Sequence, residues 1–119
     1  MKGVGETTLF LIDGVNIMLD RESYICKQAV EVFGKDTQLL MYFEEAGELA
    51  QAISKDKRGF KDKANIAEEI ADVEIMLEQL KHIYKCHYAV EQIKAKKLMR
   101  LSARIDQMLR LSPPSDRGQ

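Results

Sequence analysis

Apolar side chains recur every three or four residues over most of the chain, which is the period of an amphipathic helix. The pattern predicts four helices, over residues 20–33, 36–55, 64–84 and 88–111. Residues typical of helix ends support these limits: Asp20 is expected to cap the first helix, Gly34 to end it, and Asp36 or Thr37 to cap the second. We therefore expect an all-α fold, an antiparallel four-helix bundle-like protomer.

Three segments fall outside this helical pattern. Glycines and threonines disfavour a continuous helix over residues 1–19, so we expect an irregular N-terminal segment with at most a short extended piece or a single turn. Residues 55–63 are polar, basic and interrupted by Gly59, which predicts a loop. A Pro-Pro pair ends the last helix and leaves a flexible tail at residues 112–119. No internal boundary appears, so residues 1–119 are expected to form a single domain.

Carboxylates interrupt the apolar stripe of the third predicted helix. At about 100° per residue, Glu69 falls inside the stripe and Asp72 on its margin. The other acids of this helix point elsewhere and are expected to be ordinary solvated charges: Glu68, Glu74 and Glu78. A carboxylate that faces a core is costly unless it is paired or binds a metal ion. Glu69 is therefore the acid of this helix with the weakest structural explanation.

The second predicted helix carries a matching cluster, Glu44, Glu45 and Glu48. Glu45 and Glu48 are three residues apart, as Glu69 and Asp72 are, so each pair shares one helix face. Four carboxylates converging from two helices would repel one another without a cation, and Mg²⁺ prefers oxygen ligands. We predict a Mg²⁺ site, with more than one ion, held by these two pairs. The alternative is that Glu-rich helix faces arise by chance, but two clusters on adjacent helices favour the metal site.

The fourth predicted helix is basic beside its apolar stripe. Lys94, Lys97, Arg100 and Arg104 could contact the phosphates of a substrate. Equally, long basic side chains extend from the margin of an apolar stripe into water without any ligand. The sequence leaves these two interpretations level.

Gln38 and Asn65 precede the two carboxylate pairs on the same sides of their helices. Their amides could hydrogen-bond a base or a ribose. The alternative is that both are simply polar residues near the start of a helix. The basic residues of the loop at 55–63 are interpreted as solvated charges.

Composition limits the class of protein. The chain has 119 residues, of which 45% are hydrophobic and 31% charged, as in a soluble globular domain. A net charge of −1 argues against a strongly nucleic-acid-binding surface. Cys26 and Cys86 have no metal-binding spacing and are expected to be free thiols in a reducing compartment. No apolar run has membrane-spanning length and no signal-peptide layout is present, so a cytoplasmic protein is expected, without a membrane partner.

The acidic clusters resemble a known family. FEEAGELAQAISK at 43–55 and NIAEEIADVEIMLEQL at 65–80 are similar to segments of the MazG-like all-α nucleoside triphosphate pyrophosphohydrolases. That superfamily includes dimeric dUTPases and phosphoribosyl-ATP pyrophosphatases, and its signature is EExxE, a spacer and ExxD. GKDTQLLMYFEE resembles the lead-in to the first cluster. EQIKAKKLMRLSARI resembles the basic last helix of small, phage-type members.

The resemblance implies hydrolysis of an NTP or dNTP between the α- and β-phosphates, giving the monophosphate and pyrophosphate, as nucleotide-pool housekeeping. It implies Mg²⁺ as cofactor, with Mn²⁺ as a substitute. Glu44, or a ligand such as Glu48, would orient or deprotonate the attacking water. The implied metal ligands are Glu45, Glu48, Glu69 and Asp72, and the expected substrate contacts are Gln38, Asn65, Lys94, Lys97 and Arg100. Family members assemble as homodimers or homotetramers, which suits helices whose apolar stripes one protomer cannot easily cover.

Two other classes stay open from the sequence. One is a catalytically inactive helical-bundle interaction or regulatory protein that retains the acidic motif. The other is a nucleic-acid-associated module that uses the basic fourth helix, although the near-neutral pI of about 6.1 weighs against it.

Overall fold

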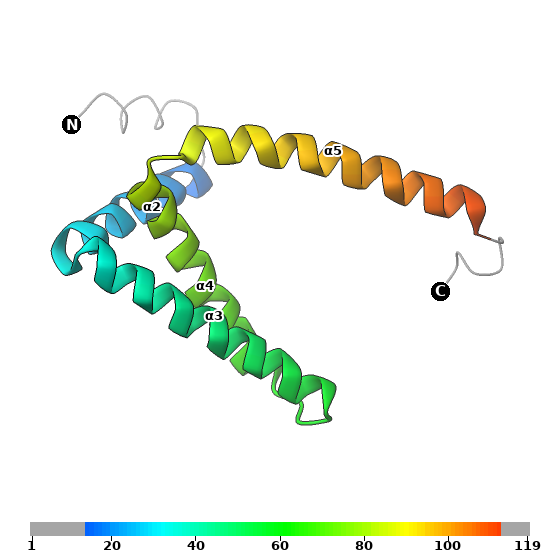
Figure 1. Ribbon diagram of the computed structural model, residues 1–119, viewed down its shortest axis with the longest axis horizontal. Helices are drawn as coiled ribbons and strands as arrows, with labels where there is room; N and C mark the ends of the chain where they lie inside the picture. Colours follow the sequence, from blue (N-terminus) through cyan, green and yellow to red (C-terminus); the bar gives the residue numbers. More distant parts are fainter. Residues whose placement is uncertain (1–13, 113–119) are drawn as a thin grey trace. The chain divides into compact units, whose positions relative to one another are not determined.

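The computed structural model describes residues 14–112, and these residues form four α-helices and no strand (Figure 1). The helices are α2 (Gly14–Phe33), α3 (Lys35–Lys57), α4 (Lys63–Tyr84) and α5 (His87–Leu111). The all-α prediction is therefore confirmed. The N-terminal segment up to residue 13 and the expected tail from residue 113 lie outside the described residues.

By its internal contacts the chain divides into two units, Met1–Lys85 and Cys86–Gln119. Helices α2, α3 and α4 belong to the first unit and α5 to the second. The single domain over residues 1–119, and a bundle that includes the fourth helix, stay predictions. Among the described residues, no helix combines the length and apolar character needed to cross a membrane.

Helix α2 begins at Gly14 rather than near Asp20. The expected N-cap at Asp20 is wrong, because this residue lies inside the helix. The irregular structure expected for residues 14–19 is wrong for the same reason. The run VNIML that follows Gly14 contains neither glycine nor proline, so nothing local stops the helix from extending back to that glycine.

Gly34 separates α2 from α3. Its φ of +96° is the kind of conformation that glycine adopts readily and other residues rarely adopt. Its N–H donates to the carbonyl of Val30 at 2.9 Å, and its carbonyl accepts from the N–H of Gln38 at 3.1 Å. The expected helix end at Gly34 is thus confirmed. The expected cap at Asp36 or Thr37 is wrong, since Gly34 also precedes α3 and no side chain caps that helix.

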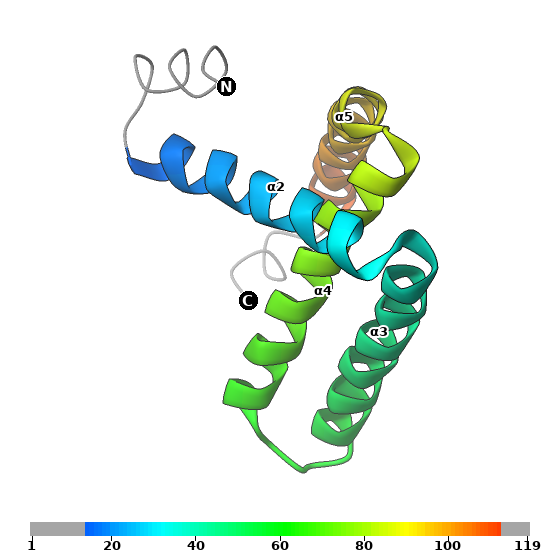
Figure 2. The same ribbon diagram turned by 90° about the vertical axis from the view of Figure 1, so that its left-hand side faces the viewer.

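Helices α3 and α4 lie side by side and antiparallel, joined by the loop at residues 58–62 (Figures 1 and 2). Asp62 caps α4 by accepting a hydrogen bond from the backbone N–H of Asn65 at 3.2 Å. Helix α2 crosses the end of this pair where α3 begins and α4 ends (Figure 2). The first unit is therefore a helical hairpin with a third helix packed across one end.

Few side chains of the described residues are buried. The buried apolar ones are Cys26, Ala52 and Met76, and the buried polar ones are Gln38 and Gln79. Large apolar side chains on the helices remain exposed, as Phe43 does at 67%. The same holds for Ile53, Ile70, Leu77, Tyr84, Leu98, Leu101, Ile105 and Met108. The stripes are present, but a single protomer does not bury them.

Candidate metal centre

The acidic clusters face each other across the α3–α4 pair. A hydrogen bond joins Gln38 to Gln79 at one level of this antiparallel pair. Two turns further along α3, and two turns back along α4, Glu45 comes level with Asp72. Glu48 and Glu69 are level about one turn beyond that. Each carboxylate pair of the sequence therefore spans the same two successive levels between the helices.

Three of the carboxylates come close together. Oxygens of Glu45, Glu48 and Glu69 all lie within 4.8 Å of one another. Glu45 and Glu69 are half-buried, whereas Glu48 is exposed. One oxygen of Glu69, Oε1, is buried and has no hydrogen-bond partner among the described residues. A buried polar atom without a partner is unusual and calls for an explanation, such as an ion.

The electrostatics of the cluster favour protonated acids or a bound cation. Burial raises the pKa of Glu45 from its usual 4.5 to about 7, aided by a hydrogen bond with Glu48 and by the charges of Glu48, Asp72 and Glu69. Burial also raises the pKa of Glu69, followed by the charges of Glu48, Asp72 and Glu68. A divalent cation among these groups would relieve the repulsion and stabilise their ionised forms.

The donor set fits a hard divalent cation. All the converging atoms are carboxylate oxygens, which suit Mg²⁺ and Mn²⁺. The unpartnered Oε1 of Glu69 is a second, independent observation that points to a bound ion. Asp72 is half-buried and acts on both raised pKa values through its charge. Its role as a direct ligand stays a prediction.

The structure gives Gln38 and Asn65 local partners. Gln38 is only 7% exposed, and its Nε2 donates to Oε1 of Gln79 at 2.7 Å. Asn65 is half-buried in the first turn of α4, where its backbone N–H is bound by Asp62. Contacts of these two residues with a nucleotide stay predictions, and for Gln38 the Nε2 atom is already used by an internal hydrogen bond.

The remaining predicted site residues are exposed. Glu44 lies on α3 and is not one of the three carboxylates that converge. Lys94, Lys97 and Arg100 belong to α5, in the second unit. The Nζ atom of Lys94 lies 3.4 Å from Oε2 of Glu91, and both side chains are more than half exposed. A role of Glu44 in activating water, and contacts of the three cations with substrate, stay predictions.

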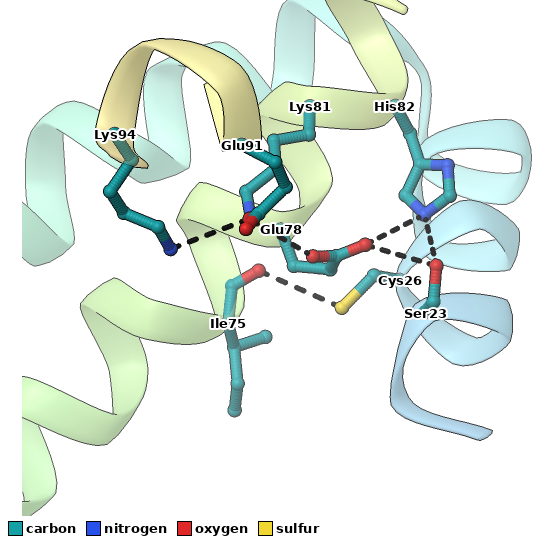
Figure 3. Close-up of polar contacts among 8 residues, drawn as sticks. All are labelled: Ser23, Cys26, Ile75, Glu78, Lys81, His82, Glu91 and Lys94. Carbon is teal, nitrogen blue, oxygen red and sulfur yellow. Dashed lines mark hydrogen bonds and ion pairs between the residues drawn. The ribbon is translucent and has the colours of Figure 1, made fainter. Parts of the chain in front are cut away.

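A second polar cluster joins α2 to α4 and was missed from the sequence (Figure 3). Ser23 Oγ donates to Glu78 Oε2 at 3.0 Å and lies 3.0 Å from Nε2 of His82. That Nε2 also lies 3.2 Å from Glu78 Oε2. The expectation that Glu78 is a solvated charge is wrong, since its side chain is only 22% exposed and faces α2. The i,i+4 spacing of Glu78 and His82 was the available signal.

Cys26 lies beside this second cluster. Its Sγ is 3.7 Å from the carbonyl oxygen of Ile75 (Figure 3). Burial raises the pKa of the Cys26 thiol, and the charges of Glu78 and Glu22 raise it further. A buried thiol held neutral in this way packs as a small apolar group rather than reacting.

The fold and the acidic centre define an all-α protein with a cluster of carboxylates, a group that could hold a cation, between two antiparallel helices. Residues 33–100 match the MazG nucleotide pyrophosphohydrolase domain, a stretch that includes α3, α4 and both acidic clusters. This match covers more than half of the chain, so the protein belongs to the MazG nucleotide pyrophosphohydrolase family. The resemblance found from the sequence is confirmed, and the general class of activity is that of a nucleotide hydrolase. No curated protein and no solved structure matches the chain.

Proposed function

We propose that the protein is a Mg²⁺-dependent nucleoside triphosphate pyrophosphohydrolase. It would cleave an NTP or dNTP between the α- and β-phosphates to the monophosphate and pyrophosphate, as part of nucleotide-pool housekeeping. The observation that carries this proposal is the convergence of Glu45, Glu48 and Glu69, with the buried Oε1 of Glu69 unpartnered, in a MazG-family chain. When bound, Mg²⁺ or Mn²⁺ neutralises phosphate oxygens and lowers the pKa of a water molecule.

The carboxylates of α3 and α4 would have two roles, binding the cation and activating the attacking water. Glu45, Glu48, Glu69 and Asp72 would hold the cation between the helices. Glu44 is exposed and lies one turn before Glu48, so it is the residue with room to orient the attacking water and accept its proton. Glu48 is the alternative base, because its side chain is the most exposed of the three that converge. The water oxygen forms the new bond to phosphorus, and pyrophosphate leaves with the electrons of the broken P–O bond.

The substrate would be held by polar residues outside the carboxylate cluster. Lys94, Lys97 and Arg100 would compensate the charge of the phosphates, since all three are exposed cations on one helix. Gln38 and Asn65 would contact the base or the sugar, Gln38 through its Oε1, because its Nε2 donates to Gln79.

Self-association would bury apolar surface that a single protomer leaves exposed. The apolar stripes of α3, α4 and α5 are largely exposed in one protomer, so a homodimer or homotetramer is proposed to cover them. Sedimentation equilibrium tests this, and a monomer at micromolar concentration would contradict it. Both cysteines are free, which suits a reducing compartment, and the cytoplasm is the proposed place of action.

The decisive experiment measures pyrophosphate and monophosphate release from each NTP and dNTP with Mg²⁺. The wild-type protein should act on at least one of them. Glu69→Gln should lower that rate by more than about 100-fold, because even changes to the partners of metal ligands cost 10- to 100-fold. Glu74→Gln is the matched control, since Glu74 is an exposed acid on the same helix and does not belong to the converging group.

Two results would contradict the proposal. Wild-type turnover in Glu69→Gln would exclude the mechanism. Absence of turnover on every nucleotide would favour the alternative, an inactive interaction or regulatory protein, for which the exposed apolar stripes already provide a surface.

A further inference from the structure

Gln38 and Gln79 are the only polar side chains that are buried among the described residues, at 7% and 5% exposure. Their hydrogen bond of 2.7 Å joins α3 to α4. An apolar pair of the same size would stabilise the helix pair at least as well, because burying amides costs desolvation free energy. The amide pair therefore calls for an explanation other than stability.

The side chains next to the glutamines along the pair restrict the alignment of α3 and α4 along their axes only weakly. Met41 and Met76 lie level between the glutamines and the acids, and methionine adapts to many neighbours. A shift of α4 by one turn toward its own N-terminus would set Glu45 opposite Met76 and Glu69 opposite Ala52. Apolar groups would still meet across the interface, but the carboxylates would no longer converge.

Repulsion between the acids favours such a shift. The carboxylates of Glu45, Glu48 and Glu69 approach within 4.8 Å from two helices, and separating them lowers their Coulomb energy. Another interaction between α3 and α4 must therefore oppose this repulsion.

We infer that the hydrogen bond between Gln38 and Gln79 sets the register of α3 against α4, so that these two glutamines are positioning residues for the carboxylate cluster. In the register shifted by one turn, Gln38 would face Ile83 and Gln79 would face Tyr42. The two amides would then lose each other, and Gln38 would lie beside an apolar side chain in a buried setting, which costs more than the bond contributes. A single buried polar residue sets the register of coiled coils in the same manner. The use of this register for metal binding rests on the proposed function.

The test replaces both amides with apolar side chains of matching length, Gln38→Met with Gln79→Met. The inter-helix distance is measured between spin labels on cysteines introduced at Thr37 and Ala67, which are exposed and lie at different levels of the pair. The background carries Cys26→Ala and Cys86→Ser, and excess unlabelled chain suppresses distances between protomers. Mn²⁺ affinity is measured separately on unlabelled protein.

The inference predicts one narrow distance in the parent protein. The methionine pair should give a second distance, displaced by about 5 Å, one helical turn. Its Mn²⁺ affinity should fall by about tenfold or more, while its thermal stability is kept or raised. Met76→Leu is the control, because it changes the same interface without touching an amide and should alter neither readout.

A methionine pair with the parent distance and the parent Mn²⁺ affinity would overturn the inference. Should that variant not fold, Gln38→Leu with Gln79→Leu provides the same comparison. The proposed function fails separately: if the wild-type protein binds no Mn²⁺ but the distance still shifts, the metal site is wrong and the register role of the glutamines stands.

Discussion

The carboxylates of Glu45 and Glu69 approach within 4.8 Å although they belong to different helices. Glu45 lies on α3 and Glu69 on α4, and both are half-buried. The protein therefore holds two carboxyl groups together where water cannot fully screen their charges. Several properties of the metal-free and metal-bound protein follow from this arrangement.

Stability of the metal-free protein should fall as pH rises. The pKa of Glu45 is raised from 4.5 to about 7, so between these values the folded protein holds a proton that the unfolded chain has released. The contribution of this proton is complete below pH 4.5 and is lost as pH passes 7. In the presence of a chelator, the urea midpoint should be higher near about pH 5 than near about pH 8.

Glu45→Gln is the control for this pH dependence. Its urea midpoint should change less over the same range, because the titrating proton is gone. Added Mg²⁺ should reverse the trend in the wild type, since a cation must displace the proton and binds better at higher pH. A wild-type midpoint that rises with pH in chelator would contradict the assignment.

Gln79→Met alone should destabilise the protein by about 1–3 kcal/mol, because it leaves the buried amide of Gln38 without its acceptor. Gln38→Met added to it should restore most of this loss by removing the unpaired amide as well. Urea unfolding of the two single variants and the double variant measures the coupling. Simple additivity of the two substitutions would show that the hydrogen bond contributes nothing.

Ser23→Ala should lower the free energy of unfolding by about 1 kcal/mol, because Ser23 donates to the carboxylate of Glu78 across the α2–α4 contact. Ser54→Ala on the exposed side of α3 is the control for the intrinsic gain of alanine in a helix. Mn²⁺ affinity should be the same in both variants. Equal stability of the two variants would mean that the contact has no net value.

Replacing Gly34 or Gly47 by alanine should change the stability of the protein in opposite directions. Gly34→Ala should cost about 1–3 kcal/mol, since the φ of +96° between α2 and α3 strains any side chain. Gly47→Ala lies inside α3, where an added Cβ meets nothing within 4 Å, and should stabilise the helix by about 0.5–1 kcal/mol. Thermal unfolding of the two variants measures these changes in stability. Stabilisation by Gly34→Ala would show that the connection between α2 and α3 adopts another conformation without cost.

The sequence predicted the features that depend only on residues close together in the chain. The ends of α3 and α4 fall close to the predicted limits, because Gly34 and the polar loop break the helical period. The N-cap predictions at Asp20 and at Asp36 or Thr37 were wrong. A capping residue is favoured but not required, and the backbone continued through Asp20 as a helix.

Roles that depend on a second helix were harder to predict. Glu78 reads as a solvated charge on a helical wheel, but α2 lies against it and supplies Ser23. No role was predicted for Gln79, because a single glutamine in a helix gives no local signal that Gln38 lies opposite and bonds to it. The apolar stripes were predicted as core, yet one protomer leaves much of them exposed.

The sequence by itself determined the helices, the two acidic pairs, the intrusion of Glu69 into an apolar stripe, and the family. The helices, the acidic pairs and the position of Glu69 follow from periodicity and spacing, which act within about one or two turns. The family was recognised from the resemblance of the two acidic segments. Only the tertiary structure decided that Glu45 and Glu48 meet Glu69, that its Oε1 is left without a partner, and that Gln38 bonds to Gln79. The reason is physical: the register between two antiparallel helices is set by side chains that are distant in the chain, and no local pattern encodes it.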